Sequence, residues 1–148
     1  MVGELALRIA GTVSGQKDMI VLEEAYHGNT KANIDISPYK HNGPGGTGPP
    51  NWVHEIPMPY LYRGLHRDPE NAGSLYADEV ENICKKLSEK GKKPSAFISE
   101  SILGCGGHVP LPDGFLKQSY EHVRQHGGFC IADEVQTGIA RTGKMLAS

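Results

Sequence analysis

The sequence lacks several features that would assign it to a class at once. No apolar run reaches the ~18 residues that a membrane-spanning helix needs, so we expect no such helix. The N-terminal segment lacks the basic, apolar and small-residue zones of a secretory signal peptide. The 15 basic and 17 acidic side chains give a formal net charge of -2. This balance gives no electrostatic footprint for nucleic acid or for an anionic membrane, and we expect neither as a partner.

Cysteine is also scarce. Cys84, Cys105 and Cys130 lie far apart and are odd in number, so they form neither a CxxC pair nor an even disulfide framework. Free thiols are typical of a reducing compartment. We therefore expect a cytoplasmic or mitochondrial-matrix location.

What the sequence does contain is an alternation of short apolar runs and amphipathic segments. Apolar runs of four or five residues predict buried strands, and apolar residues at steps of three and four predict helices. Residues 37–74 are rich in Gly and Pro and predict an irregular segment, with one short strand at 52–56. The predicted helices cover residues 4–10, 74–90 and 113–127, the last capped by Asp113, and the main predicted strands cover 19–22, 96–99 and 129–132.

This alternation predicts an α/β fold with a mainly parallel sheet. Three of the predicted strands are followed by polar residues that could act chemically, namely Tyr26-His27, Glu100 and Asp133. In parallel sheets ligands bind beyond the carboxyl ends of the strands. We therefore expect these side chains to converge on one binding site.

Two motifs carry a resemblance to a known family. The run Ile131-Ala-Asp-Glu-Val-Gln-Thr-Gly138, together with Ala25-Tyr-His-Gly28, resembles the class-III pyridoxal-phosphate-dependent aminotransferases. The resemblance implies that residues 1–148 are part of the mainly parallel-sheet large domain of a fold-type I enzyme. It implies pyridoxal 5'-phosphate as cofactor and a homodimer when intact. The implied reaction transfers or eliminates the amino group of a small amine or amino acid via an aldimine.

The resemblance also implies roles for individual residues. Pyridoxal phosphate acts as an electron sink when its ring nitrogen stays protonated, and a carboxylate, here Asp133, keeps that proton in place. Glu100 is implied to face the substrate and to pair with an Arg from a later segment. The implied cofactor contacts are the stacking ring of Tyr26, a close backbone approach at Gly28, and Val135, Gln136 and His27; for His27 a purely structural role is equally compatible.

Shorter elements resemble one branch of the family, the ethanolamine-phosphate phospho-lyases. That branch eliminates phosphate and ammonia from a phosphorylated amine, and we favour it over ordinary transamination. The elements are residues 35–40, Trp52-Val53-His54, Tyr62-Arg63-Gly64, and Glu100-Ser101 with Cys105-Gly106-Gly107.

The sequence also departs from the family pattern. Gly138-Ile139-Ala140-Arg141 stands where the family usually has Gly-aromatic-Gly-Arg. The resemblance places the Schiff-base lysine well beyond Gln136, and Lys144 is too close to be that residue. We therefore expect that these 148 residues lack the lysine and the small C-terminal domain, and that they are inactive alone.

Three other interpretations deserve comparison. An apolar strand followed by Asp133-Glu134 also fits a P-loop nucleotide-binding domain, but the sequence has no GxxxxGK[ST] motif. His122 and His126 have a spacing that can hold zinc, but no Cys pair or His-Glu-x-x-His pattern supports them, so we expect no metal site there. A non-catalytic binding or structural fragment remains an alternative.

Overall fold

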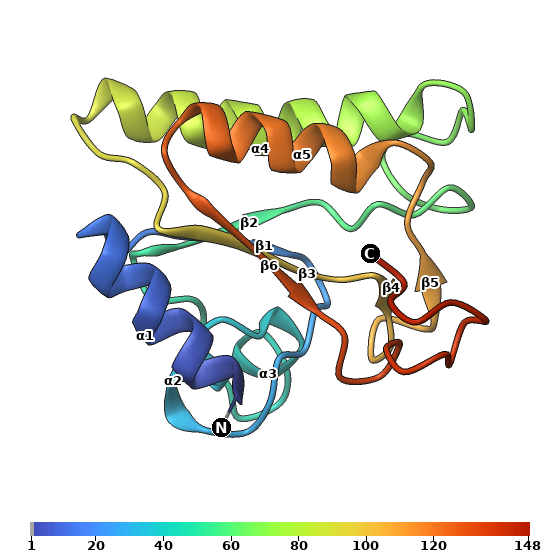
Figure 1. Cartoon of the computed structure of the whole chain (residues 1–148), viewed down its shortest axis with the longest axis horizontal. Helices are drawn as coiled ribbons and strands as arrows, with labels where there is room; N and C mark the ends of the chain where they lie inside the picture. Colours follow the sequence, from blue (N-terminus) through green and yellow to red (C-terminus); the bar gives the residue numbers. More distant parts are fainter. Residues whose placement is uncertain (1) are drawn as a thin grey trace.

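A four-stranded parallel sheet forms the centre of the fold in the computed structural model, which describes residues 2–148 (Figure 1). The strand order is β2-β1-β3-β6, and every neighbouring pair is parallel. The strands are β1 (Met19–Leu22), β2 (Val53–Ile56), β3 (Ala96–Glu100) and β6 (Phe129–Asp133). The predicted α/β class and the predicted strands, including the short one within residues 52–56, are confirmed.

Helices cover both faces of this sheet (Figure 1). The helices α4 (Ala72–Glu89) and α5 (Phe115–Gln125) lie side by side on one face, and α1 (Val2–Ser14) lies on the other. The remaining elements are short: α2 (Lys31–Asp35), α3 (Pro38–His41) and the antiparallel pair β4 (Ile102–Leu103) and β5 (Val109–Pro110).

Strand β1 is apolar throughout because both of its faces are buried. Side chains alternate across a strand, so Ile20 and Leu22 pack against α4 and α5, whereas Met19 and Val21 pack on the side of α1. The sheet thus separates two apolar cores, and a continuous apolar run is what such a doubly covered strand requires.

The helix α4 buries the stripe that its sequence predicts. Tyr76 and Val80 are fully buried and Leu87 is 2% exposed, while Ile83 packs at the edge of the same core. The helix begins at Ala72, two residues before the predicted start.

The predicted cap of α5 is wrong. Asp113 makes no capping hydrogen bond, and the N-cap position is Gly114, whose φ of 79° lies in the left-handed region that favours glycine. A Cβ on Gly73 would lie 2.0 Å from the carbonyl oxygen of Asp113, so the start of α4 packs directly on this backbone. Tertiary packing therefore sets the beginning of α5.

Residues 37–74 contain more regular structure than their composition predicts. Pro38 occupies the first turn of α3, where its missing amide hydrogen costs nothing, and β2 pairs with β1 over all four of its residues. Within residues 2–148, none of the helices has the length and apolar character needed to cross a membrane.

Candidate active site

A cavity of about 310 Å³ lies at the carboxyl edge of the sheet, where β1, β3 and β6 end. Its size falls in the range of about 300–1,000 Å³ that is usual for small-molecule sites. All seven residues that the sequence analysis selects line it, together with Val2, Gly3, Asn29 and Asn33; the seven are Tyr26, His27, Gly28, Glu100, Asp133, Val135 and Gln136.

Neighbouring strands bring the two acidic residues of this site together. Glu100 ends β3 and Asp133 ends β6, and the two residues are paired in the parallel register. The fold therefore produces the predicted convergence of strand ends at one edge.

A short contact joins Asp133 to His27. The Asp133 Oδ2 atom lies 2.8 Å from His27 Nδ1, and the His27 side chain has no exposed surface. The other carboxylate oxygen accepts a hydrogen bond from the Val135 amide at 3.1 Å. Burial by itself would raise the pKa of Asp133, but the hydrogen bond and charge of His27, with the Val135 amide, hold that pKa below its ordinary value. Asp133 is therefore ionised at neutral pH.

The second nitrogen of His27 has no hydrogen-bond partner among the described residues. His27 Nε2 is buried, and a buried polar atom without a partner is unusual in a folded protein. The backbone of this residue is fixed, because its amide donates to Ser37 Oγ at 2.9 Å. The imidazole is thus held by Asp133 through its Nδ1 atom, and its Nε2 atom can form one more hydrogen bond.

Glu100 is buried and binds two backbone amides. Its Oε1 atom accepts from the Tyr26 amide and its Oε2 atom accepts from the Gly104 amide, both at 3.1 Å. The side chain lines the cavity, but these bonds tie the segment after β1 to the turn after β3. The structure therefore gives Glu100 a role in shaping the site that the sequence analysis did not identify.

Tyr26 lies at the side of the cavity with its ring half-buried. Its ring packs edge-on against Tyr39, with 6.2 Å between the centroids. Lys40 Nζ lies 5.7 Å from the Tyr26 ring centroid and 5.5 Å from that of Tyr39, within cation–π range. A positive charge therefore lies close to the aromatic side of the site.

The backbone at Gly28 needs glycine. Its φ is +118°, and a Cβ at this position would lie 2.8 Å from Asn33 Nδ2. Asn33 itself is 2% exposed, and its Oδ1 atom is a second buried polar atom without a partner. Sequence reasoning missed Asn33 and Ser37, because the only local signal there is Thr30, whose side chain caps α2 by accepting from the Asn33 amide.

Val135 and Gln136 form the outer rim of the cavity, and Val135 is 87% exposed.

In the loop that follows, two residues other than glycine adopt the left-handed backbone conformation that favours glycine. Ile139 and Ala140 have φ values of 57° and 59°. The departure noted in the sequence at these two positions therefore coincides with backbone strain.

The cavity thus combines a buried ionised carboxylate with an aromatic ring and a close backbone approach. Such a set can hold a flat, positively charged heterocycle, because the carboxylate favours a protonated ring nitrogen and the aromatic ring offers a face for stacking. Together with the three-layer parallel fold, it defines an α/β domain with a candidate small-molecule site at its strand ends.

Comparison with known proteins assigns the family. The family model for Aminotransferase class-III matches residues 3–148. The chain belongs to the class-III aminotransferase family.

Two similar relatives represent different activities by name. The chain is 44% identical over 144 residues to an alanine–glyoxylate aminotransferase 2-like protein of Drosophila melanogaster, covering 95% of this chain and 29% of that protein. It is 38% identical over 151 residues to ethanolamine-phosphate phospho-lyase homolog 1 of Caenorhabditis elegans, covering 95% of this chain and 32% of that protein. The chain therefore spans less than a third of the length of either relative.

Solved structures share the fold. An amine transaminase from an uncultivated Pseudomonas species in its PLP-bound form is 28% identical, with a TM-score of 0.86 over 99% of this chain and 34% of that chain. A phospholyase from Arthrobacter in complex with phosphoethanolamine is 29% identical, with a TM-score of 0.82 over 97% of this chain and 34% of that chain. Membership of this family replaces the P-loop interpretation.

Proposed function

We propose that residues 1–148 form part of the cofactor-binding large domain of a pyridoxal-phosphate-dependent enzyme. The observation that carries the proposal is the buried carboxylate of Asp133, which His27 holds at the cavity that Tyr26 lines. When bound, pyridoxal 5'-phosphate supplies an electron sink for negative charge that develops on the substrate. The PLP-bound transaminase of similar fold supports this choice of cofactor.

The residues of the cavity divide this work. Asp133 would keep the proton on the ring nitrogen, and His27 positions Asp133 by its 2.8 Å contact. Tyr26 would offer its ring face to the cofactor, and the backbone at Gly28 would allow a close approach. Val135 and Gln136 would border the cofactor from the segment after β6.

Glu100 acts as a positioning residue and as a border of the substrate pocket. Its two bonds to backbone amides fix the segment that carries Tyr26 relative to the turn at Gly104. An Arg from a later segment would reach the substrate side of this carboxylate. The position of the Tyr26 ring then depends on Glu100.

For the substrate we propose a small amine or amino acid, and within that class a phosphorylated amine. The Lys40 ammonium beside the Tyr26 ring provides positive charge for a phosphate group close to the site. The phospho-lyase relative and the phosphoethanolamine complex support this choice. The reaction would consume phosphoethanolamine and water and release phosphate, ammonia and acetaldehyde. Transfer of the amino group to a keto acid is the alternative, and the Drosophila relative is named for it.

We propose that the enzyme is a homodimer in the cytosol or the mitochondrial matrix. The α1 helix presents a row of exposed apolar side chains at steps of three and four, which suits a protein contact. These side chains are Val2, Leu5, Ile9 and Val13. Relatives from Arabidopsis thaliana and Homo sapiens are named as mitochondrial proteins.

The test uses the full-length protein, with and without Asp133→Asn. We expect bound pyridoxal phosphate, seen by its absorbance, and phosphate release from phosphoethanolamine. Loss of the charge at residue 133 should lower kcat/KM about a hundredfold or more, equivalent to about 3 kcal/mol of transition-state stabilisation. The matched control is Asp113→Asn, at an exposed residue outside the cavity.

The outcomes separate the parts of the proposal. Near-normal kcat/KM in Asp133→Asn would refute the role of this carboxylate. Activity with alanine and glyoxylate but none with phosphoethanolamine would refute the phospho-lyase assignment and leave the cofactor assignment standing. Absence of bound cofactor from the full-length protein would refute the proposal as a whole and favour a non-catalytic binding or structural role.

A further inference from the structure

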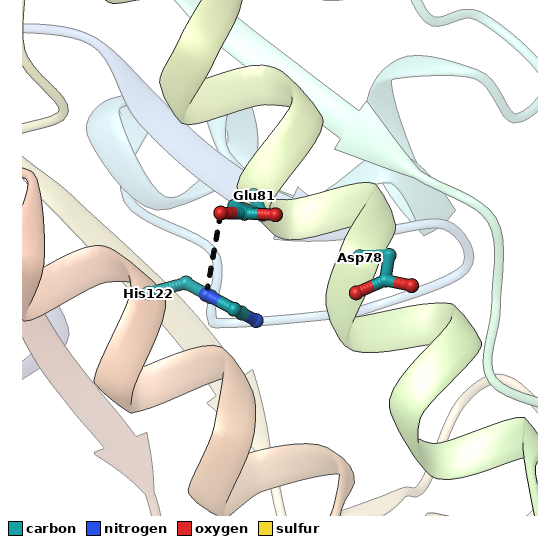
Figure 2. Close-up of side chains that lie close together, drawn as sticks. All are labelled: Asp78, Glu81 and His122. Carbon is teal, nitrogen blue, oxygen red and sulfur yellow. Dashed lines mark ion pairs between the residues drawn. The ribbon is translucent and has the colours of Figure 1, made fainter.

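A group of metal-ligand side chains lies away from the cavity, on the two helices that cover one face of the sheet. Asp78 and Glu81 are three residues apart on α4, and His122 extends from α5 toward them (Figure 2). One potential ligand atom from each side chain lies within 4.8 Å of the other two. None of these residues borders the candidate active site.

The nitrogen of His122 that points into this group lacks a hydrogen bond. Its Nδ1 atom is buried and has no hydrogen-bond partner among the described residues. It lies 3.9 Å from Glu81 Oε1, which is too long for a hydrogen bond. A metal ion would satisfy this nitrogen, which the protein atoms leave without a hydrogen bond.

The separation also suits an ion between the two atoms. With zinc–ligand bonds of about 2.0–2.1 Å, two ligands of a tetrahedral site are roughly 3.4 Å apart. The 3.9 Å between His122 Nδ1 and Glu81 Oε1 exceeds this by an amount that small side-chain rotations can remove. Asp78 is exposed, so its carboxylate is free to rotate toward the ion and solvent has access to the site.

The orientation of the Glu81 carboxylate fits the same role. Lys85 donates a hydrogen bond to the Oε2 atom at 2.9 Å, which leaves the Oε1 atom toward His122. His126, one turn after His122, is occupied differently, because its Nδ1 atom donates to the His122 carbonyl oxygen at 2.9 Å.

We propose that Asp78, Glu81 and His122 bind one divalent transition-metal ion, of which Zn²⁺ is the best match, and so link α4 to α5. The mixture of one imidazole nitrogen with two carboxylates favours zinc over magnesium or calcium, which prefer oxygen ligands alone. Water completes the coordination on the exposed side. The His pair at positions 122 and 126, considered in the sequence, is not the site; the second and third ligands come from the neighbouring helix.

The test is titration of the full-length holoprotein with ZnCl₂ in a calorimeter, and in parallel with MgCl₂. We expect one Zn²⁺ per chain, a rise in Tm with added zinc and much weaker binding of Mg²⁺. The variants His122→Gln and Asp78→Asn should each weaken zinc binding about tenfold or more. The matched control His126→Gln should leave the affinity within about twofold.

Three results would overturn the proposal. The first is an absence of zinc binding. The second is a zinc affinity of His122→Gln within twofold of that of the unmodified protein, because the ion would then lie elsewhere, such as on a cysteine. The third is equal weakening by His126→Gln and His122→Gln, which would assign the ion to the histidine pair. Each readout is independent of catalysis, so the proposed function can fail while this site stands.

Discussion

Replacing Glu100 by glutamine should destabilise the protein although the two side chains have nearly the same size and shape. Glu100 is 4% exposed, and each carboxylate oxygen accepts a hydrogen bond from one backbone amide, of Tyr26 or of Gly104. A carboxamide has one oxygen and one NH₂ group. In Glu100→Gln one of the two backbone amides therefore faces another donor and loses its partner.

The size of the effect follows from that single lost acceptor. A buried N–H left without a partner costs about 1–3 kcal/mol, so Glu100→Gln should lower the free energy of unfolding by that amount. Glu100→Ala leaves both amides without partners and should cost about 2–6 kcal/mol. These values are a large fraction of the ~5–15 kcal/mol that stabilises a typical protein.

The measurement is urea unfolding of the full-length protein at neutral pH, followed by circular dichroism without added substrate. The matched control is Glu23→Gln, because Glu23 is also a glutamate that binds a backbone amide, at 3.2 Å from Met58, but lies exposed. We expect the control to change stability by less than about 0.5 kcal/mol. If Glu100→Gln changes stability as little as the control does, the carboxylate does not hold these amides, and Glu100 would be free to serve the substrate alone.

Two further predictions concern the same cavity. Gly15→Ala, with positive φ but open space, should cost about 1 kcal/mol of stability. Gly28→Ala should cost at least about 1 kcal/mol more than that, because its Cβ would also lie 2.8 Å from Asn33 Nδ2. Equal Tm values for the two variants would contradict the close contact. Asp133 has a lowered pKa in the fold, so it contributes stability that is present above its unfolded pKa and is lost as the pH falls through its folded pKa. The difference in unfolding free energy between the unmodified protein and Asp133→Asn should therefore be largest near neutral pH and should shrink as the pH falls below about 4. A difference of unchanged size at strongly acid pH would argue against the contact with His27.

The sequence by itself determined the elements of the fold and the family. The run at 19–22 became a strand that is apolar throughout because both of its faces are covered. The runs at 96–99 and 129–132 also became strands, although β6 lies at the edge of the sheet and stays partly exposed. The stripe that begins at Tyr76 became α4 because apolar residues at steps of three and four form one buried face. The motif at 131–138 predicted a family that the comparison confirms.

Local pattern also selected residues that the fold brings to one cavity, but it did not reveal how they contact one another. Val135 shows this limit, because its place in the motif does not reveal that β6 ends at Asp133 and that Val135 lies on the exposed rim of the cavity. Asp113 shows it again, because a good capping residue lies one position too early for the helix that forms.

Only the tertiary structure decided the contacts that give the site its chemistry. His27 and Asp133 are 106 residues apart, and Tyr26 and Glu100 are 74 residues apart. Their meeting depends on the strand order β2-β1-β3-β6 and on the register that sets Glu100 beside Asp133. Helix and strand periods arise from the geometry of neighbouring residues, whereas strand order and register arise from the packing of the whole domain. The apolar pattern of a segment therefore predicts that it is a buried strand but leaves its neighbours, and so the partners of His27 and Glu100, to be set by the fold.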